Sequence, residues 1–343
     1  MPRPQGRTKR GARRGHRHGR LCYQHASERE TFRREGILPA VSSAPRPLRI
    51  AFFGLPLAAL LLARDGHDIT LASICRKDGL GLRRARRELG EGRVLVVPKV
   101  NDPRLHARVR ALAPDLLVSW FWTTRLPMEL VRCARLGGIG VHPSLLPRHR
   151  GPDPTAWAIL SGDPVTGVTV HRIAEEYDTG AILDHEEIAI DPSWNAWQLA
   201  RALDRPSLRA LRRAVGRFAR GEEINEIPQD ERLATQAPLI DDEDAAIRWS
   251  WTTEHVVRHV RALAPAPGAW TEIAGRLVTV LEVAKAPRCP MALEPGEGFA
   301  EGGRAVIRTG DGAVFLLQGE IEGAPASTED LAELFLPGTP LLG

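Results

Sequence analysis

Cysteine is scarce in this chain, and no two cysteines lie close together. The four among 343 residues are Cys22, Cys75, Cys133 and Cys289. A disulfide framework or a structural zinc site needs closely spaced or regularly paired cysteines. The spacing therefore argues against both as the basis of this fold.

Long apolar runs are missing as well. The run at Leu57–Ala63 is far shorter than the roughly 20 residues that a transmembrane helix needs. The composition, 43% hydrophobic and 26% charged, is ordinary for a globular protein. We expect no membrane segment and predict a soluble protein of the cytoplasm.

Two cofactor motifs are incomplete. Gly54 follows the first predicted strand, but Leu55–Leu57 stand where a dinucleotide-binding loop needs further glycines, so an NAD site is not expected. His255 and His259 lie four apart on a predicted helix, but Val256–Arg258 between them lack the glutamate of a zinc-protease helix. No metal is expected.

Positive charge is concentrated at the start of the chain. Residues 1–46 contain twelve Lys and Arg against three Asp and Glu, a net charge of +9. Because the whole chain carries +5, the remaining residues sum to −4. We expect residues 1–46 to be a disordered basic tail, since they have almost no apolar periodicity. The tail is an arm that binds polyanions, a targeting peptide, or translated sequence upstream of the true start.

From Leu48 onward, short apolar runs alternate with helical segments. This alternation predicts an α/β fold with a doubly wound, mostly parallel sheet. Strands are expected at Arg49–Phe53, Ile69–Ile74, Val94–Val97, Leu116–Phe121, Ile139–His142, Gly167–Ile173 and Ala181–Ile190. Helices are expected at Pro56–Arg64, Leu82–Leu89, Pro103–Leu112, Met128–Cys133, Thr155–Leu160 and Ala196–Arg220, the last interrupted near Pro206.

The chain divides into two domains by its pattern. Residues 47–221 form the first, and residues 222–246, polar and acidic with two prolines, are predicted to be a linker. Residues 247–343 contain a predicted helix at Thr253–Leu263 and then short strands separated by glycine-rich turns. This second pattern predicts a small β-barrel-like domain. Its strands are expected at Ala269–Ile273, Leu277–Val283, Arg304–Thr309 and Ala313–Gln318.

Residues 138–151, together with Asp178 downstream, are the most informative part of the sequence. His142 ends a short apolar strand, at the place where open α/β sheets bind ligands. The prolines and the glycine that follow force a fixed, non-helical loop. An imidazole beside a carboxylate transfers protons near neutral pH, so we predict an acid/base pair. The alternative is a buried histidine that only bonds a backbone carbonyl.

These motifs resemble the folate-dependent formyltransferases. That family carries Asn-x-His, then Ser-Leu-Leu-Pro-x-x-Arg-Gly, and further on Gly-Val-Thr and Asp-x-Gly. The corresponding residues here are His142, Ser144–Pro147, Arg150–Gly151, Gly167–Thr169 and Asp178–Gly180, in the same order. Four later stretches are similar to the second domain of methionyl-tRNA formyltransferases: Asp241–Trp249, Ala262–Gly268, Gly310–Gly312 and Phe335–Gly338. The resemblance covers residues 48–343.

The resemblance implies transfer of a formyl group from 10-formyltetrahydrofolate to a primary amine. By analogy, His142 donates to the oxyanion or protonates the leaving N10, while Asp178 orients His142 and helps to remove the proton of the amine. Arg150 is expected to meet an anionic substrate phosphate, and the loop at Ala174–Asp178 to read the pterin. The residues expected to line the folate site are Thr124, Leu126, Ser144, Leu145, Leu146, Pro147 and Tyr177.

One position departs from the family. Gly140 stands where the resemblance places the asparagine, two residues before the histidine, and it offers no amide to the oxyanion. Loss of one such donor costs about 10²–10³ in turnover. The sequence therefore leaves open an altered or slower enzyme, or a folate or nucleotide binder without catalysis.

Two amine acceptors fit the resemblance, and the oligomeric state is open. Initiator methionyl-tRNA is favoured by the second domain and by the arginine-rich helix within Arg76–Leu89, which could contact phosphates. An amino-sugar nucleotide is favoured by the likeness of Val118–Pro127 and Thr169–Ile190 to sugar formyltransferases, and mildly by the net charge of −4. A hydrolase that releases formate is a further alternative.

Overall fold

The computed structural model describes residues 46–288 and 292–335. The predicted basic tail up to Pro45, two cysteines (Cys22 and Cys289) and the stretch Leu336–Gly338 lie outside these residues. Within them, no helix combines the length and the apolar character that crossing a bilayer would require.

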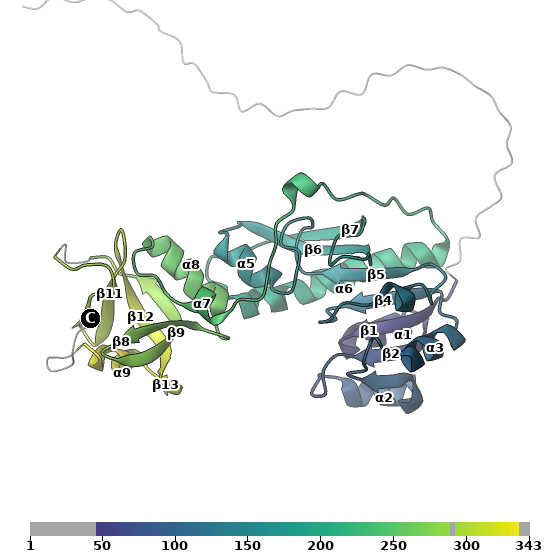
Figure 1. The fold of residues 1–343 in the computed structure, drawn as a ribbon, viewed down its shortest axis with the longest axis horizontal. Helices are drawn as coiled ribbons and strands as arrows, with labels where there is room; N and C mark the ends of the chain where they lie inside the picture. Colours follow the sequence, from purple (N-terminus) through teal and green to yellow (C-terminus); the bar gives the residue numbers. More distant parts are fainter. Residues whose placement is uncertain (1–45, 289–291, 336–343) are drawn as a thin grey trace, which may run out of the picture. The chain divides into compact units, whose positions relative to one another are not determined.

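The first sheet has seven strands in the order β3-β2-β1-β4-β5-β6-β7 (Figure 1). The pairs among β1 to β5 are parallel, whereas β6 pairs antiparallel with β5 and with β7. The predicted doubly wound, mostly parallel sheet is therefore confirmed. The strands are β1 Arg49–Gly54, β2 Asp68–Ile74, β3 Val94–Val96, β4 Leu116–Trp120, β5 Gly138–His142, β6 Val165–Arg172 and β7 Ile182–Ala189.

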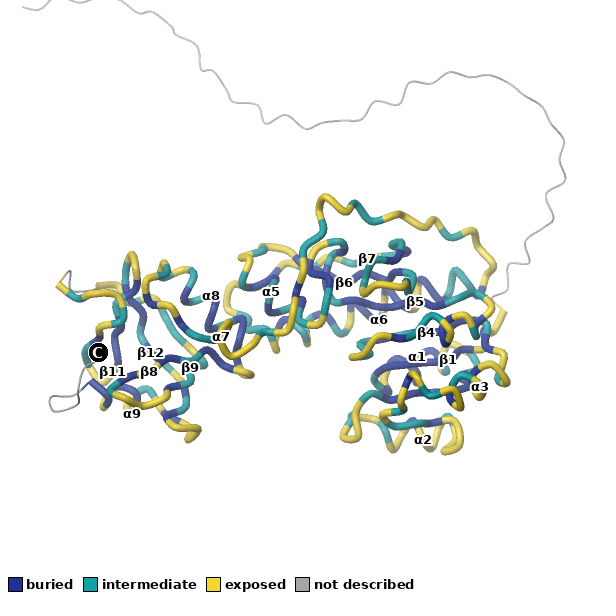
Figure 2. Tube along the Cα trace, in the orientation of Figure 1, coloured by how far each residue is buried: buried dark blue, intermediate teal, exposed yellow. Residues whose placement is uncertain are grey.

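Helices cover both faces of this sheet, because alternate residues of each strand point to opposite sides. In β1, Ile50 and Phe52 join the apolar cluster of α1 and α6, whereas Ala51 and Phe53 join that of α3 and α4. Figure 2 shows β1 as buried and most of α2 as exposed. The helices are α1 Pro56–Arg64, α2 Leu82–Leu89, α3 Pro103–Ala111, α4 Met128–Val131, α5 Pro154–Leu160 and α6 Ala196–Arg220, with a 3₁₀ turn at Glu91–Arg93.

The expected interruption of α6 near Pro206 was wrong. The helix runs through Pro206, which is itself buried, from a capping box at Asn195 to Gly221 in the left-handed conformation. Ser207 donates to the carbonyl of Asp204 and accepts a hydrogen bond from the indole of Trp120 at 3.0 Å. Packing along the whole helix therefore outweighs the hydrogen bond that proline removes.

Residues 222–246 do more than connect two domains. They include a 3₁₀ turn at Glu231–Leu233 and the helix α7 at Asp242–Ala245. Two isolated bridges tie this segment to the first domain, Ile182 with Ile227 and Arg150 with Gln236. The segment expected to be a linker is thus bonded to the loop that carries Arg150 of the motif.

The second domain is rich in strands, as predicted, and its sheet is antiparallel. Its strands pair in the order β10-β11-β12-β9-β8, and β13 pairs with β12, so the described strands form an open path. The sequence did not predict β10, β13, α7 or α9. The elements are α8 Thr253–Leu263, β8 Ala269–Ile273, β9 Arg276–Lys285, β10 Gly298–Glu301, β11 Arg304–Arg308, β12 Ala313–Ile321, β13 Ala324–Ala326 and α9 Thr328–Glu333.

Truncation of a buried side chain in α6 tests this packing. Leu203 is fully buried against the first sheet. We expect Leu203→Ala to lower the free energy of unfolding by about 2–5 kcal/mol, because it leaves a cavity. Arg205→Ala, at an exposed position of the same helix, should change it by less than about 0.5 kcal/mol. Chemical denaturation of both variants measures the difference, and equal small effects would contradict the packing described.

Candidate functional site

The structure brings His142 and Asp178 together, although 35 residues separate them in the chain. His142 is the last residue of β5, whose five residues are all buried. Asp178 lies in the turn after β6, where it adopts a left-handed φ of 57°. Its Oδ2 is 3.4 Å from Nδ1 of His142, and 16% of the Asp178 side chain is exposed against 7% of the His142 side chain. The carboxylate is thus the outer member of the pair.

The other ring nitrogen of His142 is bonded to the backbone. Nε2 lies 2.7 Å from the carbonyl oxygen of His149. A carbonyl only accepts, so Nε2 carries the hydrogen and Nδ1 is the nitrogen that faces the carboxylate. The backbone bond expected of a purely structural histidine is therefore present together with the acid/base contact.

The His149 residue that supplies this carbonyl is itself fixed. Its backbone N–H donates to Oγ1 of Thr235 at 2.8 Å, and its Nε2 lies 2.8 Å from Oδ2 of Asp163. Its φ of 57° turns the carbonyl toward the strand end. The segment after α6 thus helps to set the orientation of the His142 ring.

Asp178 has three further neighbours. The backbone N–H of Gly151 donates to Oδ2 at 3.0 Å, and Oδ1 lies 3.5 Å from Nε2 of His171. The side-chain amide of Gln229 donates to the carbonyls of Asp178 and Gly180, each at 2.7 Å. Gln229 therefore closes the turn that presents the carboxylate.

No role was predicted for His171 or Gln229 from the sequence. His171 lies directly opposite Gly140 on the antiparallel neighbour of β5, so the pairing register of β5 with β6 sets its position beside the strand that carries His142. Alternation along β6 was a usable signal, because His171 shares a face with Thr169 of the Gly-Val-Thr motif. Gln229 lies 51 residues from Asp178 in a polar segment, with no local signal.

The loop expected to line a folate site is held by the Gly-Val-Thr motif. Oγ1 of Thr169 donates to the carbonyl of Ser144 at 2.7 Å and accepts from the N–H of Leu146 at 3.0 Å. A Cβ at Gly167 would lie 2.2 Å from the carbonyl oxygen of Glu186. Glycine is therefore required there, and the threonine two residues on fixes the loop.

The other residues expected at the folate site lie on two loops that are bonded to each other. Arg125 donates to the carbonyl of Glu175 at 3.0 Å, which joins the loop after β4 to the loop after β6. Leu126 is buried, and Thr124 is exposed and accepts a hydrogen bond from Trp122. Tyr177 is 56% exposed. In the loop after β5, Ser144 and Leu146 are buried, and Leu145 and Pro147 are half-buried.

Arg150 is bonded within the chain. Its side chain is only 5% exposed, and its guanidinium donates to both carboxylate oxygens of Glu231 at 2.8 Å and to Oε1 of Gln229. The hydrogen bond from Arg150 lowers the pKa of the carboxyl of its exposed partner Glu231. Binding of a substrate phosphate by Arg150 stays a prediction.

Two family models match this chain. The Formyl transferase model covers residues 75–215, and the Formyl transferase, C-terminal domain model covers residues 239–334. A methionyl-tRNA formyltransferase of Anaeromyxobacter dehalogenans is 35% identical over 302 residues, which are 83% of this chain and 96% of the relative. A methionyl-tRNA formyltransferase of Syntrophus aciditrophicus is 33% identical over 69% of this chain and 80% of its own.

The chain belongs to the formyl transferase family. This membership confirms the prediction of a formyltransferase. Two solved structures share the fold. HypX from Aquifex aeolicus, in complex with tetrahydrofolic acid, has a TM-score of 0.60 and 21% identity over 85% of this chain, which spans about half of HypX (48%). The N-formyltransferase from Helicobacter canadensis, in complex with folinic acid and dTDP-3-aminofucose, has a TM-score of 0.60 and 14% identity over 78% of this chain and 98% of its own.

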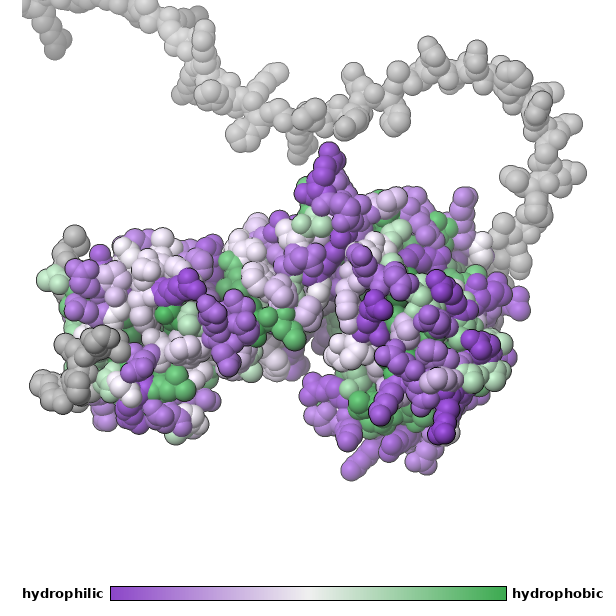
Figure 3. All heavy atoms as spheres, in the orientation of Figure 1, coloured by the Kyte–Doolittle hydropathy of each residue, from purple (hydrophilic) through white to green (hydrophobic). Residues whose placement is uncertain are grey.

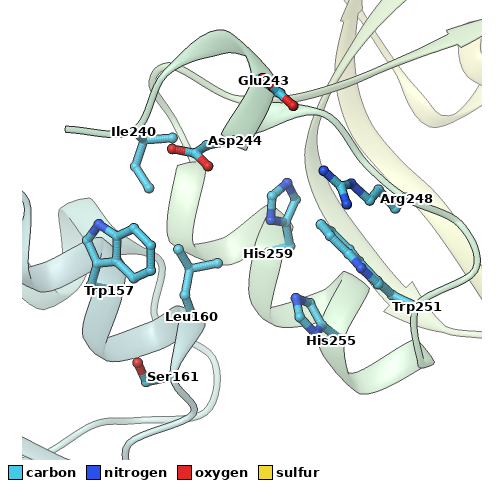
Figure 4. Close-up of a pocket in the computed structure, with 10 residues that line it drawn as sticks. All are labelled: Trp157, Leu160, Ser161, Ile240, Glu243, Asp244, Arg248, Trp251, His255 and His259. Atoms are coloured by element: carbon cyan, nitrogen blue, oxygen red, sulfur yellow. The ribbon is translucent and has the colours of Figure 1, made fainter. Parts of the chain in front are cut away.

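This formyltransferase also has a pocket of about 300 Å³ between α5 and α8 (Figure 4). None of the residues predicted to act at the folate site lines it. His255 and His259, considered above as metal ligands, line it instead and pack against Trp251 with ring centroids 4.3 and 4.9 Å away. His259 also contacts the carbonyl of Ala245.

Removal of the Gln229 amide tests how the turn at Asp178 is held in this formyltransferase. We expect Gln229→Ala to lower kcat/KM by up to about 100-fold, because a displacement of about 1 Å of a reacting group costs this much. Asn225→Ala, at an exposed position of the same segment, is the matched control and should keep full activity. Steady-state kinetics of both variants measure this difference. An unchanged kcat/KM in Gln229→Ala would show that the turn keeps its conformation without the amide.

Proposed function

We propose that this chain transfers the formyl group of 10-formyltetrahydrofolate to the amino group of methionyl-tRNA. The observation that carries the proposal is the convergence of His142 and Asp178 at the end of β5, in a family member whose second domain is also matched. The relatives named methionyl-tRNA formyltransferase are matched over as much as 96% of their length, which supports the same acceptor. The cytoplasmic location stays a prediction.

The residues present fit a folate. Two loops that are bonded to each other, after β4 and after β6, present an exposed threonine, a buried leucine and backbone groups beside Asp178. Thr124, Leu126, Tyr177 and the loop from Ser144 to Pro147 would hold it. The tetrahydrofolic acid bound by HypX, which shares the fold, agrees with this assignment.

The residues divide the proton transfers between them. Bound 10-formyltetrahydrofolate supplies the formyl carbon. We assign to Asp178, the more exposed member of the pair, the removal of the proton of the incoming amine. We assign to His142, whose Nδ1 faces this carboxylate, the delivery of a proton to the leaving nitrogen. One proton passes from the amine to Asp178 and one passes from His142 to the leaving group. Transfer of a proton from Asp178 to His142 then restores the pair.

Loss of either residue should stop turnover without unfolding the protein. We expect His142→Ala and Asp178→Asn each to lower kcat by about 10²–10⁴, the usual contribution of general acid/base catalysis. Thermal unfolding should show that both variants fold. A rate near that of the parent enzyme in either variant would remove that residue from its role.

An amino-sugar nucleotide is the second candidate acceptor. The observation that favours it is the fold shared with the Helicobacter canadensis enzyme, which was solved with dTDP-3-aminofucose. We expect formyl transfer to charged methionyl-tRNA and none to dTDP-linked amino sugars, measured by mass spectrometry of the products. The reverse pattern would overturn the proposed acceptor, and formate release without an amine would indicate a hydrolase.

The exposed arginines of α2 offer a test of tRNA contact. Arg83 and Arg86 lie on the exposed side of this helix, and Figure 3 shows mostly hydrophilic residues where Figure 1 places it. We expect Arg83→Glu/Arg86→Glu to raise KM for methionyl-tRNA about tenfold or more and to flatten its salt dependence, because phosphate contacts are lost. Arg110→Glu on α3, which packs on the opposite face of the sheet, is the control. Equal effects of both changes would remove α2 from the tRNA site.

A further inference from the structure

The pocket between α5 and α8 contains side chains that the transfer reaction does not use (Figure 4). Its volume of about 300 Å³ lies at the lower end of the range for small-molecule sites. Its walls come from α5 of the first domain, from residues 240–251 around α7, and from α8 of the second domain. A small ligand in this pocket would contact all three segments at once.

One side of the pocket is apolar. Trp157, Leu160 and Ile240 line it, and each of them is half-buried. The indole N–H of Trp157 donates to the carbonyl of Pro238 at 2.8 Å, which fixes this ring. Apolar surface that is still in contact with water favours the burial of an apolar ligand group against it.

Charged groups of both signs line the same pocket. Glu243 and Asp244 supply carboxylates, and Arg248 supplies a guanidinium, which lies over the ring of Trp251 at 5.9 Å. In the part of the chain that the structure describes, the side chains of these three charged residues form no ion pair and no hydrogen bond. In Figure 4, Asp244 and Arg248 lie on either side of His259. The pocket thus offers a hydrogen-bond acceptor to an ammonium group and a donor to a carboxylate.

The two histidines of the pocket add no positive charge at neutral pH. Burial lowers the pKa of His255 and that of His259 below their usual value. The ring of His259 is also fixed, since its Nε2 lies 3.3 Å from the carbonyl oxygen of Ala245. Neutral rings do not repel a ligand that carries an ammonium group.

Two other classes of ligand fit this pocket less well. Among residues 46–288 and 292–335, no three side chains of His, Cys, Asp or Glu are placed to share a metal ion. A nucleobase would stack on an uncovered aromatic face, but Trp251 already stacks on His255 at 4.3 Å and contacts Arg248. The phosphate of a nucleotide would also face the carboxylates of Glu243 and Asp244.

We propose that this pocket binds a free α-amino acid with an apolar side chain. The ammonium group of the ligand contacts the carboxylates of Glu243 and Asp244, and its carboxylate accepts hydrogen bonds from Arg248. Its side chain packs on Trp157 and Leu160. This binding involves no covalent step and does not depend on formyl transfer, so the proposal goes beyond the proposed function.

The pocket is connected to the catalytic histidine by two bonded segments. The segment after α6 runs beside the loop and helix that follow β5. The N–H of Arg150 donates to the carbonyl of Thr235 at 2.9 Å, and the indole of Trp157 donates to that of Pro238. Oγ1 of Thr235 also accepts from the N–H of His149, whose carbonyl orients the catalytic ring. A bound amino acid therefore also stabilises the segment that orients this ring.

Isothermal titration calorimetry of the full-length protein tests the pocket with L-leucine as the probe. We expect binding at a single site with a Kd below about 1 mM. N-acetyl-L-leucine lacks the ammonium group and L-leucine methyl ester lacks the carboxylate, so each should bind at least about tenfold more weakly. Absence of binding by L-leucine, L-methionine and L-phenylalanine would overturn the proposal, as would equal binding of the two blocked compounds.

Substitutions of exposed charges determine where the amino acid binds. We expect Glu243→Gln/Asp244→Asn and Arg248→Gln each to weaken binding of L-leucine at least about tenfold, because one charged contact is lost. Glu272→Gln and Arg276→Gln, at exposed positions of β8 and β9, are the matched controls and should keep the parent affinity. Parent affinity in the pocket variants would place the ligand elsewhere and overturn the proposal.

Thermal unfolding gives a second readout without activity. L-leucine at about 100 times its Kd should lower the unfolding equilibrium constant about 100-fold and raise the unfolding temperature, because it binds the folded protein. The pocket variants should unfold like the parent without ligand and should lose most of this rise. An unchanged unfolding temperature of the parent protein would contradict the proposal. If the protein formylates no amine, the proposed function fails, whereas these measurements still decide whether the pocket binds an amino acid.

Discussion

The site depends on one constraint, the holding of the His142 ring between a backbone carbonyl and a carboxylate. The carbonyl of His149 takes the hydrogen of Nε2 at 2.7 Å, and this leaves Nδ1 toward Asp178. The two neighbouring loops hold the partners of the ring. The loop after β5 turns the carbonyl of His149 toward the ring. The turn after β6 brings the carboxylate of Asp178, which is 36 positions after His142 in the sequence. A ring free to flip would offer its nitrogens to neither partner reliably.

The segment after α6 is part of this arrangement. Gln229 closes the turn at Asp178, Thr235 fixes His149, and Glu231 neutralises the buried Arg150. Burial of an arginine is costly unless it is paired, so this pairing is a condition for the loop to lie where it does. A stretch whose composition is that of a connector thus contributes three side chains that orient the site.

The fold was largely predictable from the sequence where local signals are strong. Thr253–Leu263 was predicted with its observed bounds, because a threonine caps it and its apolar residues recur at helical spacing. The helix at Thr328–Glu333 was missed although Ser327 and Asp330 form a capping box. The three- and four-residue strands β13 and β10 are too short to show a period. The prediction of a break at Pro206 was wrong because a helix tolerates proline where its packing is favourable enough. The burial along α6 that provides this packing cannot be read from the local sequence.

The candidate site was predictable as far as its residues stand in motifs. His142 and Asp178 were named in advance, but the position of His171 depends on the register of two antiparallel strands, and that of Gln229 on a return of the chain over the first domain. Both are long-range consequences of folding. The most direct test of the account is a crystal structure with 5-formyltetrahydrofolate, a stable analogue. The account predicts the formyl group beside Asp178, with the pterin between the loops after β4 and β6. Folate bound instead in the pocket between α5 and α8 would contradict it.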